Sequence, residues 1–295
     1  MIDKSINLIG ENKETTIIDG GKIGIGIFVS SNRVNISGFT IKNCGEEWYN
    51  AGIKIESDFN VISNNIITSN NPNGLYLVLS RFNIIKGNSI LSNDYGINLE
   101  TSSYNTIENN TIISNVYAGI WAFYSRRNNI INNIISDSES AINILDNSIN
   151  NKILNNNIYS NEFYGIYLGE NYNTVSRNTI SDNEIAIFVA NCKRNDIIEN
   201  NILDNKWGIF LENFGARVNS IQKNNFIGNE ISAYFLNTLR NKWDKNYWDD
   251  SNEVPTIIHG ELYFVFPYTD PPIIIQIPLK NFDRNPAQEP YDIDI

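Results

Sequence analysis

Short segments of alternating apolar and polar positions return along the chain at a nearly constant interval. A small residue followed by a triplet of the form Ile-x-Leu recurs about every 22 residues. The small residues are Gly52, Gly74, Gly96, Gly119, Ala141, Gly165, Ala186 and Gly208. Because successive side chains of a strand point to opposite faces, each triplet predicts a short strand with two inward apolar residues and one outward residue.

Three series of polar turn residues keep the same interval. The first, written Asn-x-Ile or Asn-x-Val, begins at Asn60, Asn83, Asn105, Asn129, Asn151, Asn173, Asn195 and Asn219. The second begins at Asn64, Asn88, Asn110, Asn132, Asn156, Asn178, Asn200 and Asn224, and the third is Asn70, Asn93, Asn115, Asp137, Asn161, Asn183, Asn205 and Asn229. One coil cannot bury its own apolar residues, so coils must stack, and the turn amides can then bond to one another in ladders.

The chain is therefore predicted to be all-β: a right-handed parallel β-helix with three parallel sheets and about 22 residues per coil. Residues 1–240 are assigned to the helix, with irregular entry coils over residues 1–50. The repeat stops near Asn241, and residues 241–295 are rich in Pro and aromatic residues. We expect this irregular tail to cap the last coil or to run back along the outside of the helix, because solenoid ends need covering.

Several motifs resemble a known superfamily. Residues 16–20 (Thr-Ile-Ile-Asp-Gly) and 36–41 (Ile-Ser-Gly-Phe-Thr-Ile), followed by the Asn-x-Ile coils, resemble the pectin-lyase-like β-helix proteins. Within that superfamily they resemble the NosD-type proteins, a periplasmic group associated with copper-enzyme maturation. The tail segments 246–249 and 285–292 resemble the ends of such domains in surface proteins. The resemblance implies an extracellular, cell-surface or periplasmic location.

Charge and composition limit the classes of binding partner that we expect. The formal net charge is −11, so no basic surface is expected for nucleic acid. The two cysteines, Cys44 and Cys192, fall about seven coils apart, beyond disulfide reach. No run of eighteen apolar residues predicts a membrane span, and no signal segment is recognised. The strand-like start at residues 6–10 suggests that further coils and a secretion signal precede it.

Copper binding is disfavoured by the residues present. Copper sites use His, Cys or Met, and the chain has His259, Met1 and the two distant cysteines. We expect no cofactor, with calcium as a possibility only if the chain acts on a polysaccharide.

Catalytic residues are not recognisable either. By resemblance, lyases and epimerases of this fold use calcium-binding carboxylates and a basic residue on the outer face of one sheet. The acidic outward residues here, Glu56, Glu100, Glu170 and Glu212, are several coils apart. Glycosidase-like carboxylate pairs can be imagined only at Asp94 with Glu100 or Asp137 with Glu139.

The outward residue of each triplet is the most informative feature. This position reads Phe28, Lys54, Tyr76, Asn98, Trp121, Asn143, Tyr167, Phe188, Phe210 and Phe235. Such an apolar stripe marks a covered or a binding surface. We expect the C-terminal tail to cover the Phe188–Phe235 half. Aromatic rings and amides alternate in the other half, which predicts glycan contact at Tyr76, Asn98, Trp121, Asn143 and Tyr167.

Three functions remain open at this point. The first is an extracellular or periplasmic binding and scaffold module for carbohydrate, and the sequence favours it. The second is a polysaccharide-acting lyase, epimerase or glycosidase. The third is a structural cell-envelope protein whose stripe packs on a neighbouring subunit. Exposed aromatic residues without clustered carboxylates and a cation favour the first over the second.

Overall fold

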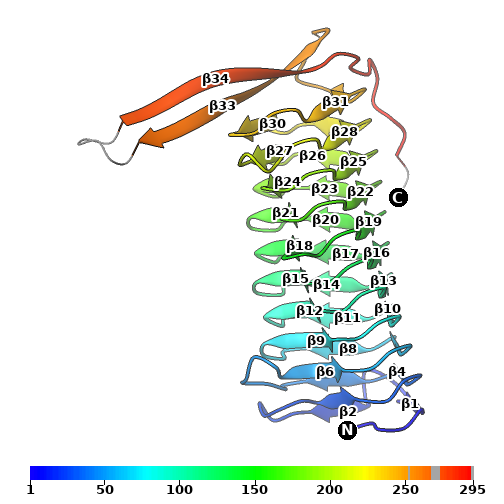
Figure 1. Ribbon diagram of the computed structural model, residues 1–295. Helices are drawn as coiled ribbons and strands as arrows, with labels where there is room; N and C mark the ends of the chain where they lie inside the picture. Colours follow the sequence, from blue (N-terminus) through cyan, green and yellow to red (C-terminus); the bar gives the residue numbers. More distant parts are fainter. Residues whose placement is uncertain (252, 267–272, 294–295) are drawn as a thin grey trace.

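The computed structural model describes residues 1–251, 253–266 and 273–293, and the regular elements there are all strands. They form a right-handed parallel β-helix, so the predicted fold is confirmed (Figure 1). Each rung contributes one strand to each of three sheets. Equivalent residues on adjacent rungs are 21 to 24 residues apart in the regular part of the helix, for example Ile166 and Ile187 or Asp196 and Ser220.

The first sheet contains the strand that follows each Asn-x-Ile turn of the first series. Its strands are β1 (Asn7–Ile9), β4 (Asn35–Ser37), β7 (Val61–Ser63), β10 (Ile84–Lys86), β13 (Thr106–Glu108), β16 (Asn129–Ile131), β19 (Lys152–Leu154), β22 (Thr174–Ser176), β25 (Asp196–Ile198), β28 (Ser220–Gln222) and β31 (Lys242–Asp244).

The second sheet follows directly in each rung. Its strands are β2 (Ile17–Asp19), β5 (Thr40–Lys42), β8 (Ile66–Thr68), β11 (Ser89–Leu91), β14 (Thr111–Ile113), β17 (Ile134–Ser136), β20 (Asn157–Tyr159), β23 (Thr179–Ser181), β26 (Asn201–Leu203), β29 (Asn225–Ile227) and β32 (Tyr247–Trp248).

The third sheet is built from the Ile-x-Leu triplets and has the longest strands of the helix. They are β3 (Ile27–Val29), β6 (Ala51–Ile55), β9 (Asn73–Val78), β12 (Tyr95–Glu100), β15 (Ala118–Phe123), β18 (Ser140–Leu145), β21 (Tyr164–Leu168), β24 (Ile185–Ala190), β27 (Trp207–Glu212) and β30 (Ile231–Leu236).

The core is a set of aliphatic columns running along the helix axis. In the first sheet Ile85 pairs with Ile62 below it and Ile107 above it, and all three are fully buried. Each such Ile contributes roughly 1.5–3 kcal/mol of burial free energy. The small residue before the triplet is required where the rungs approach closely: a Cβ on Gly119 would lie 2.6 Å from Cγ2 of Ile135.

At each corner of the regular rungs, a residue with a left-handed backbone precedes a ladder residue, and the corner between the first and second sheets is a two-residue turn, such as residues 109–110 between β13 and β14. The residue before each ladder Asn has a left-handed backbone, as at Tyr104 (φ 61°) before Asn105. Asn105 then donates through Nδ2 to Oδ1 of Asn128 on the next rung, at 3.2 Å. The predicted Asn ladders are confirmed, with four positions displaced by one residue. The ladder members are Asn65, Asn128 and Asn133, where the sequence suggested Asn64, Asn129 and Asn132. At the position expected for Asp137, Ser138 replaces the amide: its backbone N–H donates to Oδ1 of Asn161, and Asn115 donates to main-chain carbonyls, so the third ladder is interrupted there.

The helix continues past the expected boundary at residue 240, because β31 and β32 add to the first and second sheets. Beyond them, β33 (Thr256–Phe266) and β34 (Ile273–Asp283) pair antiparallel in a ribbon. The ribbon adds to the end of the helix through Tyr234↔His259 and Trp243↔Asp283. Its other end projects away from the helix (Figure 1).

The last described segment returns along the outside of the second sheet. Tyr291 donates its backbone N–H to Oδ1 of Asn225 at 2.8 Å, and Asn201 donates through Nδ2 to the carbonyl of Ile293 at 3.3 Å. In the described part of the tail, these contacts lie on the second sheet. The ribbon of the tail pairs with β30 at the end of the third sheet. Among the described residues, no ring contact or hydrogen bond joins the tail to Phe188 or Phe210, where the sequence predicted a covering tail.

Candidate functional site

The outer face of the third sheet carries the predicted site in one unbroken column. Successive rungs pair Lys54 with Tyr76, Tyr76 with Asn98, Asn98 with Trp121, Trp121 with Asn143, and Asn143 with Tyr167. The column continues through Phe188, Phe210 and Tyr234. Its last aromatic member is Tyr234, whereas Phe235 points into the core and is 3% exposed. We call these residues the central column.

The predicted contact residues differ in their access to solvent. Tyr76, Asn98 and Asn143 are buried, with exposed fractions of 4%, 2% and 6%. Trp121 and Tyr167 are half-buried. Three of the five side chains therefore lie beneath their neighbours and cannot offer a ring face or an amide to a bulky ligand in this conformation.

Asn98 and Asn73 explain part of this burial. Asn98 donates through Nδ2 to Oδ1 of Asn73 at 2.9 Å, and Asn73 donates to the carbonyls of Trp48 and Asn50, both at 2.9 Å. These bonds fasten the irregular loop around residues 44–50 onto the third sheet. The amide of Asn98 is thus a structural group.

The densest cluster of titratable side chains on this face surrounds Tyr76. Its hydroxyl donates to Oε2 of Glu100, and Nζ of Lys54 lies 5.6 Å from its ring centroid. Lys54 is itself paired with Glu56 at 2.8 Å. Burial, followed by the hydrogen bond and charge of Glu100 and the charge of Glu56, raises the pKa of Tyr76 above its usual 10.0. A catalytic phenolate base would need a lowered pKa, so this group does not suit proton abstraction near neutral pH.

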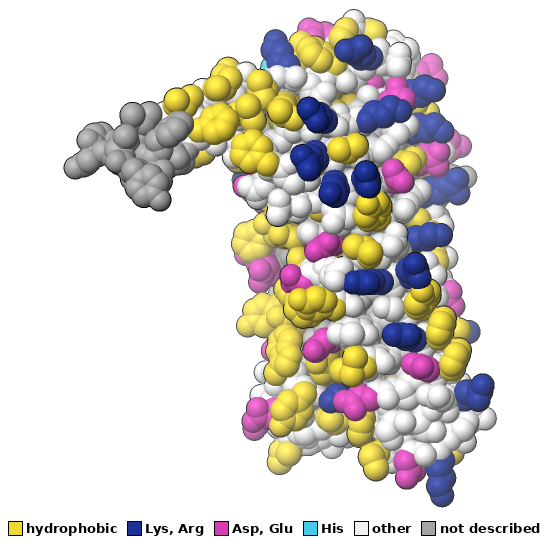
Figure 2. All heavy atoms as spheres, viewed as in Figure 1, with side chains coloured by type: hydrophobic (Ala, Val, Ile, Leu, Met, Phe, Trp, Pro, Cys, Tyr) yellow, Lys and Arg dark blue, Asp and Glu magenta, His cyan; other side chains and the backbone are white. Residues whose placement is uncertain are grey.

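A more accessible row of side chains borders the same sheet. It consists of the residue just before each third-sheet strand. Backbone hydrogen bonds join these segments from one rung to the next. We call these residues the leading edge: Asp94, Tyr117, Glu139, Phe163, Glu184 and Lys206. Tyr117 is 47% exposed and Phe163 43%, with Glu139 exposed between them. Figure 2 shows hydrophobic side chains with acidic ones between them along the left side of the solenoid.

Four aromatic rings meet where the leading edge adjoins the central column. The Tyr95 ring lies 5.5 Å from Trp48, 5.4 Å from Tyr117 and 5.5 Å from Trp121, measured between centroids. We call these four residues the aromatic cluster. Trp48 is 53% exposed. Burial, followed by the charges of Tyr117, Asp94 and Glu139, raises the pKa of Tyr95, so the cluster is bordered by carboxylates.

The leading edge was not predicted from the sequence, although the sequence contains a signal for it. Each of its members lies two residues before the small residue of a triplet, as Tyr117 does before Gly119. The outward residue inside the triplet does not mark this position. Trp48 could not have been found in this way, because it lies in the irregular loop outside the repeat.

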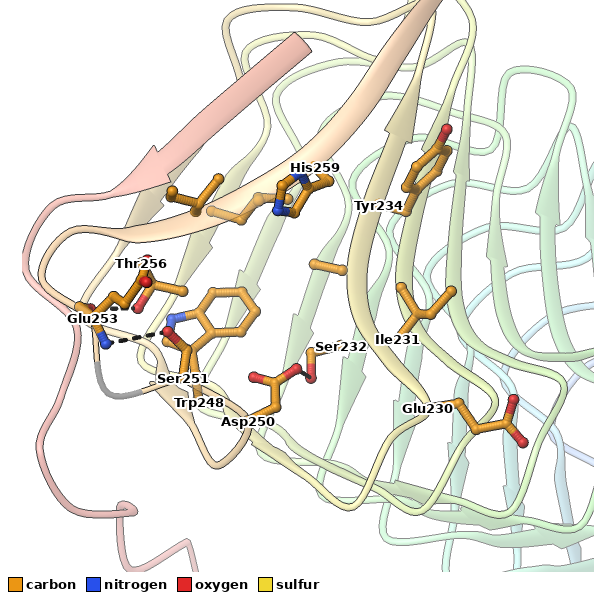
Figure 3. A pocket seen from close by; sticks show the side chains of 13 residues that line it. Glu230, Ile231, Ser232, Tyr234, Trp248, Asp250, Ser251, Glu253, Thr256 and His259 are labelled. Atoms are coloured by element: carbon orange, nitrogen blue, oxygen red, sulfur yellow. Dashed lines mark hydrogen bonds between the residues drawn. The ribbon is translucent and has the colours of Figure 1, made fainter. Parts of the chain in front are cut away.

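A separate cavity of about 620 Å³ lies where the ribbon joins the helix (Figure 3). Its lining includes Tyr234, Trp248 and His259. Oδ2 of Asp250 accepts a hydrogen bond from Ser232 at 2.8 Å, so this carboxylate is already engaged. Burial, and then the charge and hydrogen bond of Glu261, raises the pKa of Tyr234. We assign this cavity no chemistry.

Comparison with known proteins places the fold in a family. The family model described as a right handed beta helix region matches residues 23–172, slightly more than half of the chain. The chain belongs to the right-handed β-helix family. Residues 150–263 match the family described as periplasmic copper-binding protein (NosD). Among curated proteins no match is found.

Solved structures show the same β-helix architecture. The A-module of mannuronan C-5 epimerase AlgE6 from Azotobacter vinelandii has a TM-score of 0.71 and 14% identity, covering 83% of this chain and 77% of that one. The Dettilon tailspike protein has a TM-score of 0.60 and 14% identity, covering 94% and 67%. The periplasmic alginate epimerase AlgG has a TM-score of 0.53 and 15% identity, covering 77% and 66%. At these identities the likeness shows the fold.

The residues of this β-helix do not fit the copper that the NosD family name implies. Cys44 and Cys192 are buried on separate rungs, 2% and 1% exposed, and Cys192 is enclosed by Leu168 and Asn195. His259 lies on β33, where Lys280 pairs with it. Within the described ranges, no three His, Cys, Asp or Glu side chains are close enough to hold a metal ion.

The same ranges contain no helix with the length and apolarity needed to cross a bilayer.

Proposed function

We propose that the chain is a carbohydrate-binding and scaffold module of an extracellular or periplasmic protein, and that it contacts a glycan along the leading edge and the aromatic cluster. The observation that carries this proposal is the row in which exposed Tyr117 and Phe163 alternate with Asp94, Glu139 and Glu184. Neighbours in the row are one rung apart, about 4.8 Å.

The chemistry of the row suits sugar rings. An exposed aromatic face packs against the C–H face of a pyranose, and Tyr and Trp add a polar atom at the ring edge. A carboxylate beside the ring accepts hydrogen bonds from sugar hydroxyls, and such charge-assisted bonds are stronger than neutral ones. The carboxylates would repel an acidic chain, so the proposed ligand of the leading edge is a neutral glycan.

The comparisons support a polysaccharide ligand and an extracellular or periplasmic location, whereas the neutral charge of the proposed glycan rests on the carboxylates of the leading edge. Two of the similar structures carry the names of epimerases acting on mannuronan or alginate, and a third is a tailspike protein. The matched family is described as periplasmic. Trp121 and Tyr167 of the central column remain in the proposed site as half-buried supports for the exposed rings. Asn98 and Asn143 lie beside these two supports on adjacent rungs, and Tyr76 lies beside Asn98.

The test is affinity electrophoresis of the purified chain through gels containing a panel of neutral polysaccharides, with calcium and with chelator. The double variant Trp48→Ala/Tyr117→Ala removes two exposed rings of the aromatic cluster. The matched control is Phe59→Ala/Phe82→Ala, because these rings are equally exposed, at 48% and 45%, but lie at another corner.

We expect retardation of the wild type and of the control, loss of retardation in the double variant, and no dependence on calcium. Failure of every neutral polysaccharide to retard the wild type would overturn the proposal. Equal loss in both double variants would also overturn it, because the binding would then not be located at the leading edge.

A further inference from the structure

Arginine side chains gather at one corner of this acidic molecule. The corner joins each third-sheet strand to the first-sheet strand of the next rung. Arg81, Arg126 and Arg127 there line a cavity of about 410 Å³, together with Tyr104 and other residues. The further lining residues are Thr101, Ser103, Tyr124, Ile149 and Asn150. In Figure 2, Lys and Arg side chains follow the length of the solenoid on the face in view.

Three positive charges meet here without an acid in the lining. None of the nine lining residues is Asp or Glu, and the ion pairs between described residues include none of the three arginines. The nearest recorded carboxylate contact is with the main chain: the backbone N–H of Arg81 donates to Oδ1 of Asp58 at 2.7 Å. Like charges brought together without a counter-charge favour the entry of an anion.

Two of the arginines are held in position by contacts that leave most of their donors free. Arg126 donates through Nε to the carbonyl of Asn147 at 3.1 Å. Arg127 donates through Nη1 to the Tyr104 hydroxyl, and its Cζ lies 5.4 Å from the Tyr104 ring centroid. Each guanidinium has five N–H donors, so each keeps four for a ligand. Preorganised donors lower the entropic cost of binding.

Tyr104 is fixed in turn by the rungs below it. Tyr104, Phe82 and Phe59 occupy the left-handed position of this corner, and their rings stack at 5.2 and 5.1 Å. Arg127 therefore continues an ordered stack. This corner is a formed site on the side of the third sheet opposite the leading edge, since Tyr117 precedes β15 and Tyr124 follows it.

We propose that the cavity lined by Arg81, Arg126 and Arg127 binds an oxyanion, either a free inorganic anion or the carboxylate or sulfate group of an acidic saccharide. Planar guanidinium groups match the geometry of carboxylate and sulfate oxygens and bind them with paired hydrogen bonds. The hydroxyls of Thr101 and Ser103 supply neutral donors. This inference does not depend on the neutral-glycan site proposed above.

The experiment is isothermal titration of the full chain at constant ionic strength with inorganic sulfate, with tetragalacturonate and with maltotetraose. The test variant is Arg81→Gln/Arg126→Gln. The matched control is Arg194→Gln, because Arg194 donates to the Tyr172 hydroxyl at 2.6 Å and lies 5.6 Å from that ring, as in the Arg127–Tyr104 pair, but does not line the cavity. Circular dichroism establishes that each variant is folded.

We expect the Kd for sulfate to rise at least about tenfold in the test variant and less than about twofold in the control. Tighter binding of tetragalacturonate than of sulfate assigns the site to acidic saccharides, and equal affinity assigns it to free anions. Absence of sulfate and tetragalacturonate binding by the wild type overturns the proposal. An equal rise of Kd in test variant and control overturns it as well.

Discussion

At the scale of single residues, the ladder amides are the main stabilising groups outside the apolar core. Asn156 is fully buried, and its Nδ2 donates to the carbonyls of Ile130 and Leu154 and to Oδ1 of Asn178. Its own Oδ1 accepts from the backbone and side chain of Asn133. Among the described residues no buried side-chain N or O atom lacks a partner. Removing one member therefore leaves several polar groups unsatisfied at once.

We predict that Asn156→Ala lowers the free energy of unfolding by about 3 kcal/mol or more, because each buried group left without a partner costs roughly 1–3 kcal/mol. The neighbouring Asn157 lies on the outer side of β20, and Asn157→Ala is expected to change stability by less than about 0.5 kcal/mol. Urea denaturation of both variants measures the difference. A loss below about 1 kcal/mol for Asn156→Ala would contradict the ladder account.

Burial also sets the behaviour of Cys192 in alkali. Its thiol donates to the carbonyl of Leu168 at 3.1 Å, and burial raises its pKa from the usual 9.0 to about 12. As pH rises, the thiol of the unfolded chain ionises first. The stability that depends on the neutral thiol is complete below pH 9 and is lost between pH 9 and about pH 12.

We therefore predict that stability falls more steeply from pH 8 to pH 10 in the wild type than in Cys192→Ser, by about 1 kcal/mol. The serine keeps a hydroxyl donor and does not titrate in this range, while all tyrosines are unchanged. Chemical denaturation at the two pH values gives the comparison. Equal slopes in the two proteins would show that the thiol is as accessible as in the unfolded chain.

The sequence predicted most of the ladder residues, and the exceptions have a local cause. Where two polar residues adjoin, as at Asn132-Asn133, both fit an Asn-x-Ile pattern. The backbone decides between them: Asn132 takes the left-handed position with φ 55°, and Asn133 enters the ladder. Asn suits both roles, so composition alone cannot separate them.

At the scale of elements, the third sheet shows what a repeat can and cannot predict. The alternation within the triplets predicts that one outward residue of each rung lies beside that of the next rung. The structure shows this register for Tyr76, Asn98, Trp121, Asn143 and Tyr167. Their burial does not follow, because it depends on residues outside the triplets. The assignment failed at Phe235, where the preceding Tyr234 is the outward residue and Phe235 packs in the core.

The end of the helix depends on a single carboxylate of the ribbon. Asp283 is fully buried, and its Oδ2 accepts from the backbone N–H and Nδ2 of Asn246 at 2.8 and 2.9 Å and from Nε1 of Trp248 at 3.2 Å. Asn246 is the last amide of its ladder, so Asp283 supplies the acceptor that a further rung would otherwise provide.

We predict that Asp283→Ala releases the ribbon from the end of the helix, with a lower Tm and faster proteolysis between residues 253 and 293. Asp283→Asn is expected to have a smaller effect, because the amide keeps one acceptor oxygen. Glu289→Ala, an exposed acidic residue in the same segment, serves as the control and should digest as the wild type does. Limited proteolysis with mass spectrometry follows the cleavage sites. Unchanged digestion of Asp283→Ala would mean that strand pairing alone holds the ribbon.

At the scale of the whole molecule, each rung contacts only its neighbours, and stability is accordingly a sum of rung and interface terms. The three ladders and the aliphatic columns extend this coupling along the axis. On the surface, different corners of the rungs carry different sets of charged and aromatic side chains. The proposed glycan and oxyanion sites use two different corners of the same rungs. Function can therefore vary at the corners without disturbing the core that the sequence repeat encodes.

This one-dimensional construction predicts a gradient of amide hydrogen exchange. Rungs in the middle, such as the one containing β13, β14 and β15, have a paired rung on both sides, and their amides should exchange most slowly. The strand β2 pairs only with β5, and its Ile17 is 49% exposed, so the first rung should exchange fastest within the helix. Asn156→Ala should raise exchange on both sides of β20 and leave the first rungs unchanged. Hydrogen exchange with mass spectrometry resolves these regions. Uniform protection from the first rung to the last, or a uniform loss of protection in the variant, would show that the helix opens as one cooperative unit.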